Sequence, residues 1–489
     1  MSKVRVRFGP SPTGALHIGG VRTALYNWLF ARQNGGTFIL RIEDTDKTRE
    51  VPGGIEQIME ALRWYGLDWD EGPEVGGDFG PYIQSQRLEF YRKYADQLVE
   101  SGHAYRAYDT AERLQAMREE QQKRGVPSGY DRRHRYLTDK ERADYESAGA
   151  PYVIRFAVPT EGETVIHDAV YGDVTYKNKV LDDQVLLKSD GFPTYGLANV
   201  VDDHLMEISH VFRGEDWLPS APIHVMVYEA LGWKPPVYVH LANLLGPDKK
   251  KLAKRNGDAD ALSFRDRGYV LEALINFLAL QGWSSRDDRD IFSLDELLEK
   301  FSLGGLLNHS PITDVQKLDW YNGIYIRAFS LSELTRRCLP FLQNAGLVTL
   351  DPDQETLEYI ERVIALEQER IHTLADAPEL AAFFLLPDDA YEFDPKAVQK
   401  WFGHTGVGAR LGAVRDGFEG LDDWNAATTE AVVRDVIARF EVKGGEVIHP
   451  VRVALSGRQT GPGLFEMIEV LGRTRTLARL DRAIGMTTA

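Results

Sequence analysis

Apolar and polar positions first predict a strand, a helix and a second strand at the start of the chain. Between residues 3 and 8, apolar side chains alternate with basic ones, which is the spacing of a strand with one buried face. Residues 15–31 carry apolar positions at helical spacing, Gly35-Gly36 ends that pattern, and residues 37–42 are predicted to form the second strand. This order predicts a right-handed parallel unit and therefore an α/β domain.

The rest of the pattern divides into a mixed region and a helical region. Further helices are predicted at 51–65, 86–101 and 222–231, and further strands at 152–156, 165–167 and 185–187. A polar stretch at 109–149 interrupts the pattern, as an inserted domain would. After residue 259 the periodicity is almost wholly helical to the end.

The composition is that of a folded chain. Its 489 residues predict about three or four domains. An apolar share of 43% excludes a disordered chain, and no apolar run reaches the roughly 18 residues of a membrane-spanning helix. The first residues lack the apolar core of a signal peptide, and the single cysteine, Cys338, cannot form an internal disulfide. We therefore expect a reduced, cytoplasmic location without a membrane partner, and Cys338 in the core.

The first segment that could carry chemistry is residues 7–20, RFGPSPTGALHIGG. A strand leads through a turn into a helix N-terminus, where backbone N–H groups and the helix dipole favour phosphate. Gly14, Gly19 and Gly20 would let a ligand approach the backbone, and His17 could donate to a phosphate. An ordinary strand-to-helix turn with a capping histidine is the alternative interpretation.

The second segment is a basic loop at residues 246–257, GPDKKKLAKRNG. The chain carries a net charge of −17, which argues against indiscriminate binding to nucleic acid, so this local gathering of lysines stands out. Its lysines could grip triphosphate oxygens. A solvated surface loop is the commoner fate of such a run.

Together, the two segments resemble the HIGH and KMSKS signature motifs of class I aminoacyl-tRNA synthetases, here HIGG at 17–20 and KLAKR at 251–255. Segments that resemble the glutamyl and glutaminyl branch are RIEDTD at 41–46, LKSDGFPTY at 187–195, LANVVDDH at 197–204 and RGEDW at 213–217. GPGLFE at 461–466 and the helical second half are similar to the bacterial glutamyl type, whereas glutaminyl relatives are expected to carry β-barrels there.

The resemblance implies a Rossmann-type catalytic domain with an α/β insertion, followed by all-α domains that bind tRNA. The implied boundaries are 1–104 and 189–257 for the two catalytic halves, 105–188 for the acceptor-stem insertion, 258–325 for a stem-contact domain and 326–489 for an anticodon-binding region that could divide near 392.

The implied reaction activates L-glutamate with ATP and transfers it to tRNA(Glu). The residues that match the family's catalytic positions are His17, Lys254 and Lys251. Those that match ATP-binding positions are His17, Gly19, Gly20, Asp216, Leu245, Lys251 and Lys254. Those that match glutamate-binding positions are Arg7, Ser11, Glu43, Tyr195, Asn199 and Arg213. Outside this context, Glu43 would be interpreted as a strand-end salt bridge and Tyr195 as a core aromatic residue.

The chemistry of this set is coherent with a dicarboxylate substrate. Glu43 would hold the α-ammonium group, and Arg213 the side-chain carboxylate, because an unpaired buried guanidinium would penalise the neutral amide of glutamine. Magnesium would accompany ATP, held mainly by phosphates and waters. Candidate contacts with tRNA are Arg132, Arg133, Arg370 and Arg475, although each could equally lie on a solvated helix face.

The chain departs from the family pattern at three places. Gly20 replaces the second histidine of many relatives, and Ala253 replaces the usual serine. The insertion segment 102–108 lacks cysteine, so no zinc is predicted. A monomer is expected. Other hypotheses are a nucleotidyltransferase that acts on small molecules, an RNA-binding paralogue with weakened catalysis, and a synthetase that also charges glutamine tRNA.

Restoring the usual serine tests whether the loop is weakened. If Ala253 slows adenylate formation by removing a hydroxyl donor to the phosphates, Ala253→Ser is expected to accelerate that step in stopped-flow measurements, since a donor to developing charge contributes up to about 10²–10³ in rate. An unchanged adenylation rate would remove the idea of a weakened loop.

Overall fold

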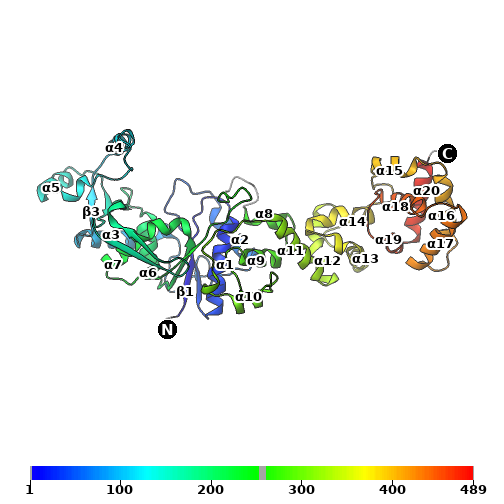
Figure 1. Cartoon of the computed structure of the whole chain (residues 1–489), viewed down its shortest axis with the longest axis horizontal. Coiled ribbons are helices and arrows are strands. Elements are labelled where there is room, and N and C mark those ends of the chain that lie inside the picture. Colours follow the sequence, from blue (N-terminus) through cyan, green and yellow to red (C-terminus); the bar gives the residue numbers. More distant parts are fainter. Residues whose placement is uncertain (1–2, 253–259, 488–489) are drawn as a thin grey trace. The chain divides into compact units, whose positions relative to one another are not determined.

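The computed structural model describes residues 3–252 and 260–487 (Figure 1). The chain forms two compact units, Met1–Phe264 with Leu274–Asp314, and Arg265–Ala273 with Val315–Ala489. The predicted position 254 and the departure at 253 both lie outside the described residues.

The first unit is built on a six-stranded sheet with the order β2-β1-β8-β9-β5-β6. Neighbouring strands run parallel except at the edge, where β6 is antiparallel to β5. The strands are β1 Arg5–Phe8, β2 Thr37–Leu40, β5 Glu163–Asp168, β6 Gly172–Lys177, β8 His210–Gly214 and β9 Val237–Leu241. The first two strands are wholly buried, as expected of a parallel sheet covered on both faces.

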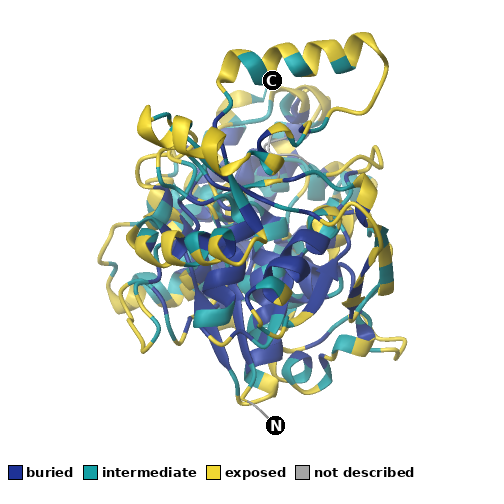
Figure 2. Ribbon diagram, turned by 90° about the vertical axis from the view of Figure 1, so that its left-hand side faces the viewer, coloured by how far each residue is buried: buried dark blue, intermediate teal, exposed yellow. Residues whose placement is uncertain are grey.

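Helices connect the strands of this sheet. They are α1 Ile18–Gln33, α2 Gly54–Trp64, α3 Leu88–Glu100, α6 Tyr195–Leu205 and α7 Ala221–Ala230. Figure 2 shows the buried residues gathered around these strands and helices, with exposed residues outside them. The strand at the start, the helix after it and the second strand confirm the predicted α/β unit.

A smaller antiparallel sheet follows, with the order β3-β4-β7. Its strands are β3 Ala104–Ala107, β4 Val153–Phe156 and β7 Val185–Leu187, and the polar stretch before β4 contains α4 Ala111–Lys123 and α5 Asp139–Ser147. Neither of these helices buries a residue, which explains why no apolar periodicity marked them. The β5–β6 hairpin lies inside the predicted insertion in sequence, yet it completes the edge of the larger sheet. The domain boundaries stay a prediction.

Short helices extend the first unit and make up the second. They are α8 Ala261–Asp266, α9 Leu271–Ala279, α10 Leu294–Lys300, α11 Val315–Ala328, α12 Leu331–Asn344, α13 Gln354–Glu367, α14 Ala377–Leu385, α15 Pro395–Phe402, α16 Val407–Glu419, α17 Ala426–Arg439, α18 Gly445–Ser456, α19 Leu464–Leu471 and α20 Arg473–Met486. The helical second half predicted from periodicity is confirmed.

Two further observations concern predictions about composition. Cys338 on α12 is fully buried, as expected, and burial raises the pKa of its thiol to about 12. Among the described residues, none of the helices has the length and apolarity needed to cross a bilayer.

Gly457 provides a test of the second unit's packing. It ends α18 with a φ of 73°, and a Cβ there would collide with the backbone carbonyl oxygen of Glu392. Gly457→Ala is therefore expected to destabilise the protein by at least about 1–3 kcal/mol, measured by denaturant unfolding. The matched control is Gly412→Ala in α16, which meets no atom within 4 Å and should be neutral or stabilising by up to about 1 kcal/mol. Equal stability of the two variants would contradict this account of Gly457.

Candidate functional site

A cavity of about 850 Å³ opens at the carboxyl ends of β1 and β8. In parallel sheets this edge is where ligands bind, because loops and helix N-termini converge there. Residues of the predicted glutamate site that line the cavity are Arg7, Ser11, Glu43, Tyr195 and Arg213. The structure therefore brings together five side chains, of which the first, Arg7, and the last, Arg213, lie more than 200 positions apart in the sequence.

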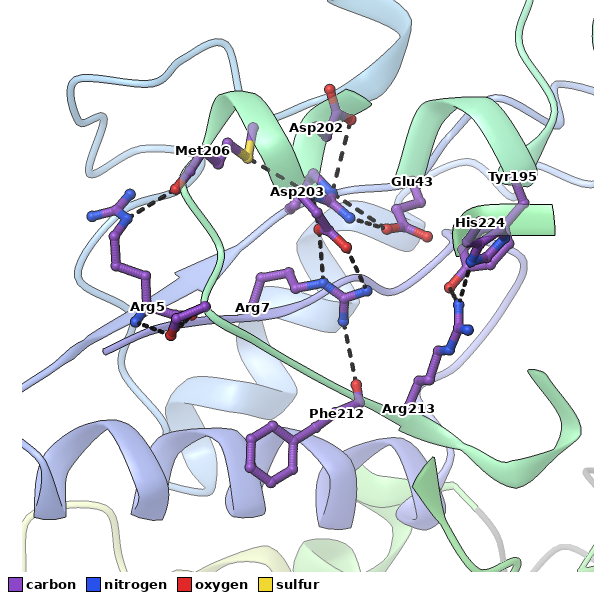
Figure 3. A network of polar contacts seen from close by, with 12 residues as sticks. Arg5, Arg7, Glu43, Tyr195, Asp202, Asp203, Met206, Phe212, Arg213 and His224 are labelled. Atoms are coloured by element: carbon purple, nitrogen blue, oxygen red, sulfur yellow. Dashed lines mark hydrogen bonds and ion pairs between the residues drawn. The ribbon is translucent and has the colours of Figure 1, made fainter. Parts of the chain in front are cut away.

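One buried carboxylate, Asp203 on α6, organises the cavity floor (Figure 3). It accepts from Arg7 Nε at 2.9 Å and Nη2 at 3.3 Å, and from Arg41 Nη1 at 2.7 Å. Burial alone would raise the pKa of Asp203, but the two guanidiniums lower it below its ordinary value. The resulting stabilisation is therefore present above the ordinary aspartate pKa and is lost only as the pH falls through the lowered value.

Asn199 closes this network one helical turn before Asp203. With its carbonyl oxygen toward the guanidiniums, it accepts from Arg7 Nη2 at 2.9 Å and from Arg41 Nη2 at 3.2 Å, while its amide nitrogen donates to Asp203 Oδ2 at 3.2 Å. The side chain is buried, and these hydrogen bonds use both its oxygen and its nitrogen. Asn199 thus holds Arg7 in place beneath the cavity.

Glu43 lies on the wall of the cavity and is only 7% exposed. Its Oε1 accepts from Arg41 Nη2 at 2.9 Å. Glu43 therefore forms the salt bridge of the alternative interpretation and also lines the cavity. Burial raises the pKa of this carboxyl above its ordinary value, and Arg41 and Arg7 oppose that shift. A side chain at Gly9 would collide with the Glu43 carboxyl group, so glycine is required for the close approach.

Arg213 differs from Arg7 and Arg41 because the side chains that form hydrogen bonds with its guanidinium are neutral. Its Nη1 lies 2.9 Å from His224 Nδ1 and 3.4 Å from the Tyr195 hydroxyl (Figure 3). Its Nε donates to His240 Nε2 at 3.0 Å. Its buried Nη2 has no hydrogen-bond partner in residues 3–252 and 260–487. Within the described part of the chain, no carboxylate lies within 4 Å of this guanidinium.

A second cavity of about 490 Å³ lies at the N-terminus of α1. Its lining includes predicted ATP-binding residues, namely His17, Gly19, Gly20, Asp216 and Lys251. His17 caps the helix, with Nδ1 accepting from the backbone N–H of Gly19 at 3.0 Å. In the neutral ring this contact places the proton on Nε2, which makes that nitrogen a donor.

Two details of the second cavity refine the sequence interpretation. A side chain at Gly20 would press against Leu16, so the missing second histidine has a local steric reason. Leu245, a predicted ATP-binding residue, is not among the residues that line this cavity, whereas its neighbour Leu244 is. The backbone of Leu245 forms a β-bridge with Lys251, and its N–H donates to the carbonyl oxygen of Pro311. Lys251 forms an ion pair with Asp216, and burial lowers the pKa of its ammonium group.

The arginines predicted to contact RNA have different surroundings. Arg132 donates to Asp183 Oδ1 at 3.0 Å and Arg370 pairs with Glu367. Arg475 donates to Asp388 Oδ1 at 2.9 Å and to backbone carbonyls of the helix α14 region, which is a structural use of its donors. Arg133 is exposed. Their roles toward RNA stay predictions.

Several residues of the site were not assigned a role from sequence. They are Arg41, Asp203, His224, His240 and Asp168. The only signal for Asp203 was a pair of adjacent aspartates inside an otherwise apolar helix, which is unusual for an interior position. The histidines gave no signal, because a lone histidine in an apolar strand or helix reads as core.

Among the residues that the structure describes, no group of three or more His, Cys, Asp or Glu side chains is placed to hold a metal ion.

Comparison with known families identifies the class to which this arrangement belongs. Residues 3–320 match the family described as tRNA synthetases class I (E and Q), catalytic domain. Residues 333–484 match the family described as anticodon binding domain. The fold and the two matches thus define a class I aminoacyl-tRNA synthetase.

Full-length relatives narrow the class further. The chain is 46% identical over 483 residues to the glutamate–tRNA ligase of Moorella thermoacetica, covering 99% of this chain and 98% of that protein. A crystal structure of a glutamate tRNA ligase from Elizabethkingia meningosepticum, in complex with its amino acid, superposes with a TM-score of 0.91 at 36% identity and full coverage of both chains. The glutamate–tRNA synthetase of Elizabethkingia anophelis gives 0.88 at 37% identity, covering 99% of this chain and all of that one. The chain belongs to the glutamate–tRNA ligase family.

The role of Asp203 can be separated from that of its neighbour. Asp203→Asn removes the charge that holds Arg7 and Arg41, and is expected to cost about 3–5 kcal/mol of stability and to raise the KM for glutamate at least about tenfold. Aminoacylation kinetics and denaturant unfolding measure the two effects.

Asp202→Asn is the matched control. Asp202 is equally buried and accepts hydrogen bonds from Arg87, Gln84 and Tyr91 rather than from Arg7. It lies 3.9 Å from Arg41 Nε, whereas Asp203 lies 2.7 Å from Arg41 Nη1. This variant should lose stability while keeping the KM for glutamate. The same KM change in both variants would mean that the effect is one of folding alone.

Proposed function

We propose that the chain attaches L-glutamate to the 3′ end of tRNA(Glu) in two steps. A carboxylate oxygen of glutamate attacks the α-phosphorus of ATP and pyrophosphate leaves, which forms glutamyl-adenylate. A terminal ribose hydroxyl of the tRNA then attacks the acyl carbon and AMP leaves. The observation that carries the proposal is a cavity whose lining includes a buried carboxylate, Glu43, and a buried arginine, Arg213, which has no carboxylate partner among the described residues.

The cavity matches the charges of glutamate. Glu43 supplies a carboxylate for the α-ammonium group, and Arg213 a guanidinium for the side-chain carboxylate, with Tyr195 beside it as a hydroxyl donor. Arg7 and Ser11 contribute polar groups to the same wall, and Asn199 acts beneath it by fixing Arg7. Positioning and charge complementarity, rather than a covalent intermediate, then carry the reaction.

The second cavity would hold ATP. His17 Nε2 can donate to phosphate oxygens, and glycines 19 and 20 allow phosphate to approach the N-terminus of α1. Lys251 and Lys254 of the basic loop are the two further catalytic candidates. Magnesium would enter with ATP, held mainly by its phosphates and by water, and the carboxylate of Asp216 is an oxygen donor of the kind that Mg²⁺ accepts. We propose no zinc.

The tRNA would be held along the rest of the chain. The match to an anticodon binding domain at 333–484 supports reading of the anticodon there. Exposed Arg133 in the predicted insertion is a candidate phosphate contact for the acceptor end. We propose that the protein acts as a monomer in the cytoplasm.

ATP–pyrophosphate exchange tests the proposal. Exchange is expected with glutamate and not with glutamine, and the expected pattern is that it requires tRNA(Glu), as the family resemblance implies. Exchange with glutamate in the absence of tRNA would keep the reaction and discard that coupling.

Other outcomes would favour the competing hypotheses. Transfer of glutamate to glutamine tRNA in the same mixture would show a synthetase that does not discriminate between the two tRNAs. Absence of exchange under every condition, with tRNA still bound, would overturn the proposed enzyme and leave an RNA-binding paralogue.

A further inference from the structure

The polar groups behind Arg213 form a chain that runs from the cavity across β9 to the end of β5. Asp168 ends β5, His240 lies on β9, and Arg213 lies on β8, so the contacts cross adjacent strands. All three side chains are at least 94% buried. His224 reaches the same guanidinium from α7.

Asp168 fixes the tautomer of His240. Its Oδ2 accepts from His240 Nδ1 at 2.6 Å and from the His240 backbone N–H at 3.1 Å, while Oδ1 accepts from two backbone N–H groups of the following turn, each at 2.9 Å. Burial would raise the pKa of Asp168, but these hydrogen bonds lower it, so the carboxylate is ionised. His240 Nδ1 therefore carries the proton, and Nε2 presents a lone pair to Arg213 Nε.

His224 presents a lone pair to the same guanidinium from the other side. Its Nδ1 lies 2.9 Å from Arg213 Nη1, which is always protonated, so the histidine nitrogen must accept. Burial, reinforced by Arg213, lowers the pKa of His224 well below its ordinary value, and burial also lowers the pKa of His240. Both rings are therefore neutral acceptors.

The consequence is an arginine that is fixed in place but not neutralised. Arg7 and Arg41 on the floor both contact the Asp203 carboxylate, so their charges are compensated inside the protein. Arg213 has two neutral rings and a phenol as acceptors, and its buried Nη2 has no hydrogen-bond partner among the described residues. A buried guanidinium of this kind gains most from a ligand that brings a full negative charge.

Resting on the proposed function, we propose that His224 and the Asp168–His240 pair are positioning residues that set the preference for glutamate over glutamine. They orient Arg213 through neutral acceptors and keep its charge for the side-chain carboxylate of the substrate. A carboxylate in place of either ring would hold the guanidinium equally well in geometry, yet it would remove the reason to prefer an anion.

A pair of isosteric variants separates geometry from charge. The oxygen of an asparagine or aspartate side chain can take the place of a histidine Nδ1, so His224→Asn keeps a neutral acceptor for Arg213 and His224→Asp adds one negative charge. The measurements are KM and kcat for glutamate and for glutamine in tRNA charging, the KM for ATP, and thermal unfolding of each variant.

The two variants are expected to differ in the KM for glutamate and in the preference for glutamate over glutamine, but not in the KM for ATP. His224→Asn should keep the preference for glutamate, with a KM for glutamate near that of the parent. His224→Asp should raise the KM for glutamate by about 10- to 100-fold relative to His224→Asn and reduce the ratio of kcat/KM for glutamate over glutamine, with an unchanged KM for ATP. Equal selectivity of the two folded variants would overturn the proposal.

A second substitution keeps the proposal testable if the aspartate variant does not fold. In His240→Gln, the amide oxygen can still accept from Arg213 Nε, but the link to Asp168 is lost, so the KM for glutamate should rise while the KM for ATP stays constant. A parental KM for glutamate would overturn the positioning role. Failure of the parent protein itself to charge glutamate would instead reject the proposed function, so the two failures are distinguishable.

Discussion

The buried carboxylate of Asp203 is the interaction on which the site depends. The guanidiniums of Arg7 in β1 and of Arg41, which directly follows β2, converge on it, and without it they would be two like charges side by side in the interior. A buried ion pair of this kind contributes little net stability compared with an apolar core, but loss of one partner is costly. Its effect here is geometric, because it joins the first strand of the sheet to α6 and thereby fixes the floor of the cavity.

The site contains two kinds of buried arginine, which differ in the groups that accept their hydrogen bonds. Arg7 and Arg41 are neutralised within the protein and serve as structural elements, and Arg7 also lines the cavity. Arg213 is held by neutral rings, so its charge is directed to the cavity. The difference lies in the hydrogen-bond acceptors and not in the arginine itself. It is therefore set by residues behind the cavity wall and not by those that face the substrate.

In the proposed ATP site, the phosphates would meet the backbone more than side chains. The N-terminus of α1 supplies N–H groups and a dipole, and His17 is oriented by accepting from one of those N–H groups. Gly20 lies against Leu16, so that position is constrained by packing within the unit. Activation would then depend on fixed dipoles and donors rather than on a nucleophile of the protein.

The sequence by itself determined the α/β start of the chain and the helical second half, and its motifs named five of the residues that line the cavity, because hydrophobic periodicity and short motifs are local properties. It could not show that Asp203 neutralises two arginines, that the 163–177 hairpin completes the larger sheet, or that Arg475 spends its donors on protein acceptors. Asp168, His240 and Arg213 come from three strands that are neighbours only in the folded sheet. Their meeting was decided by the tertiary structure, because strand order, and not sequence distance, sets which buried groups can share a hydrogen bond.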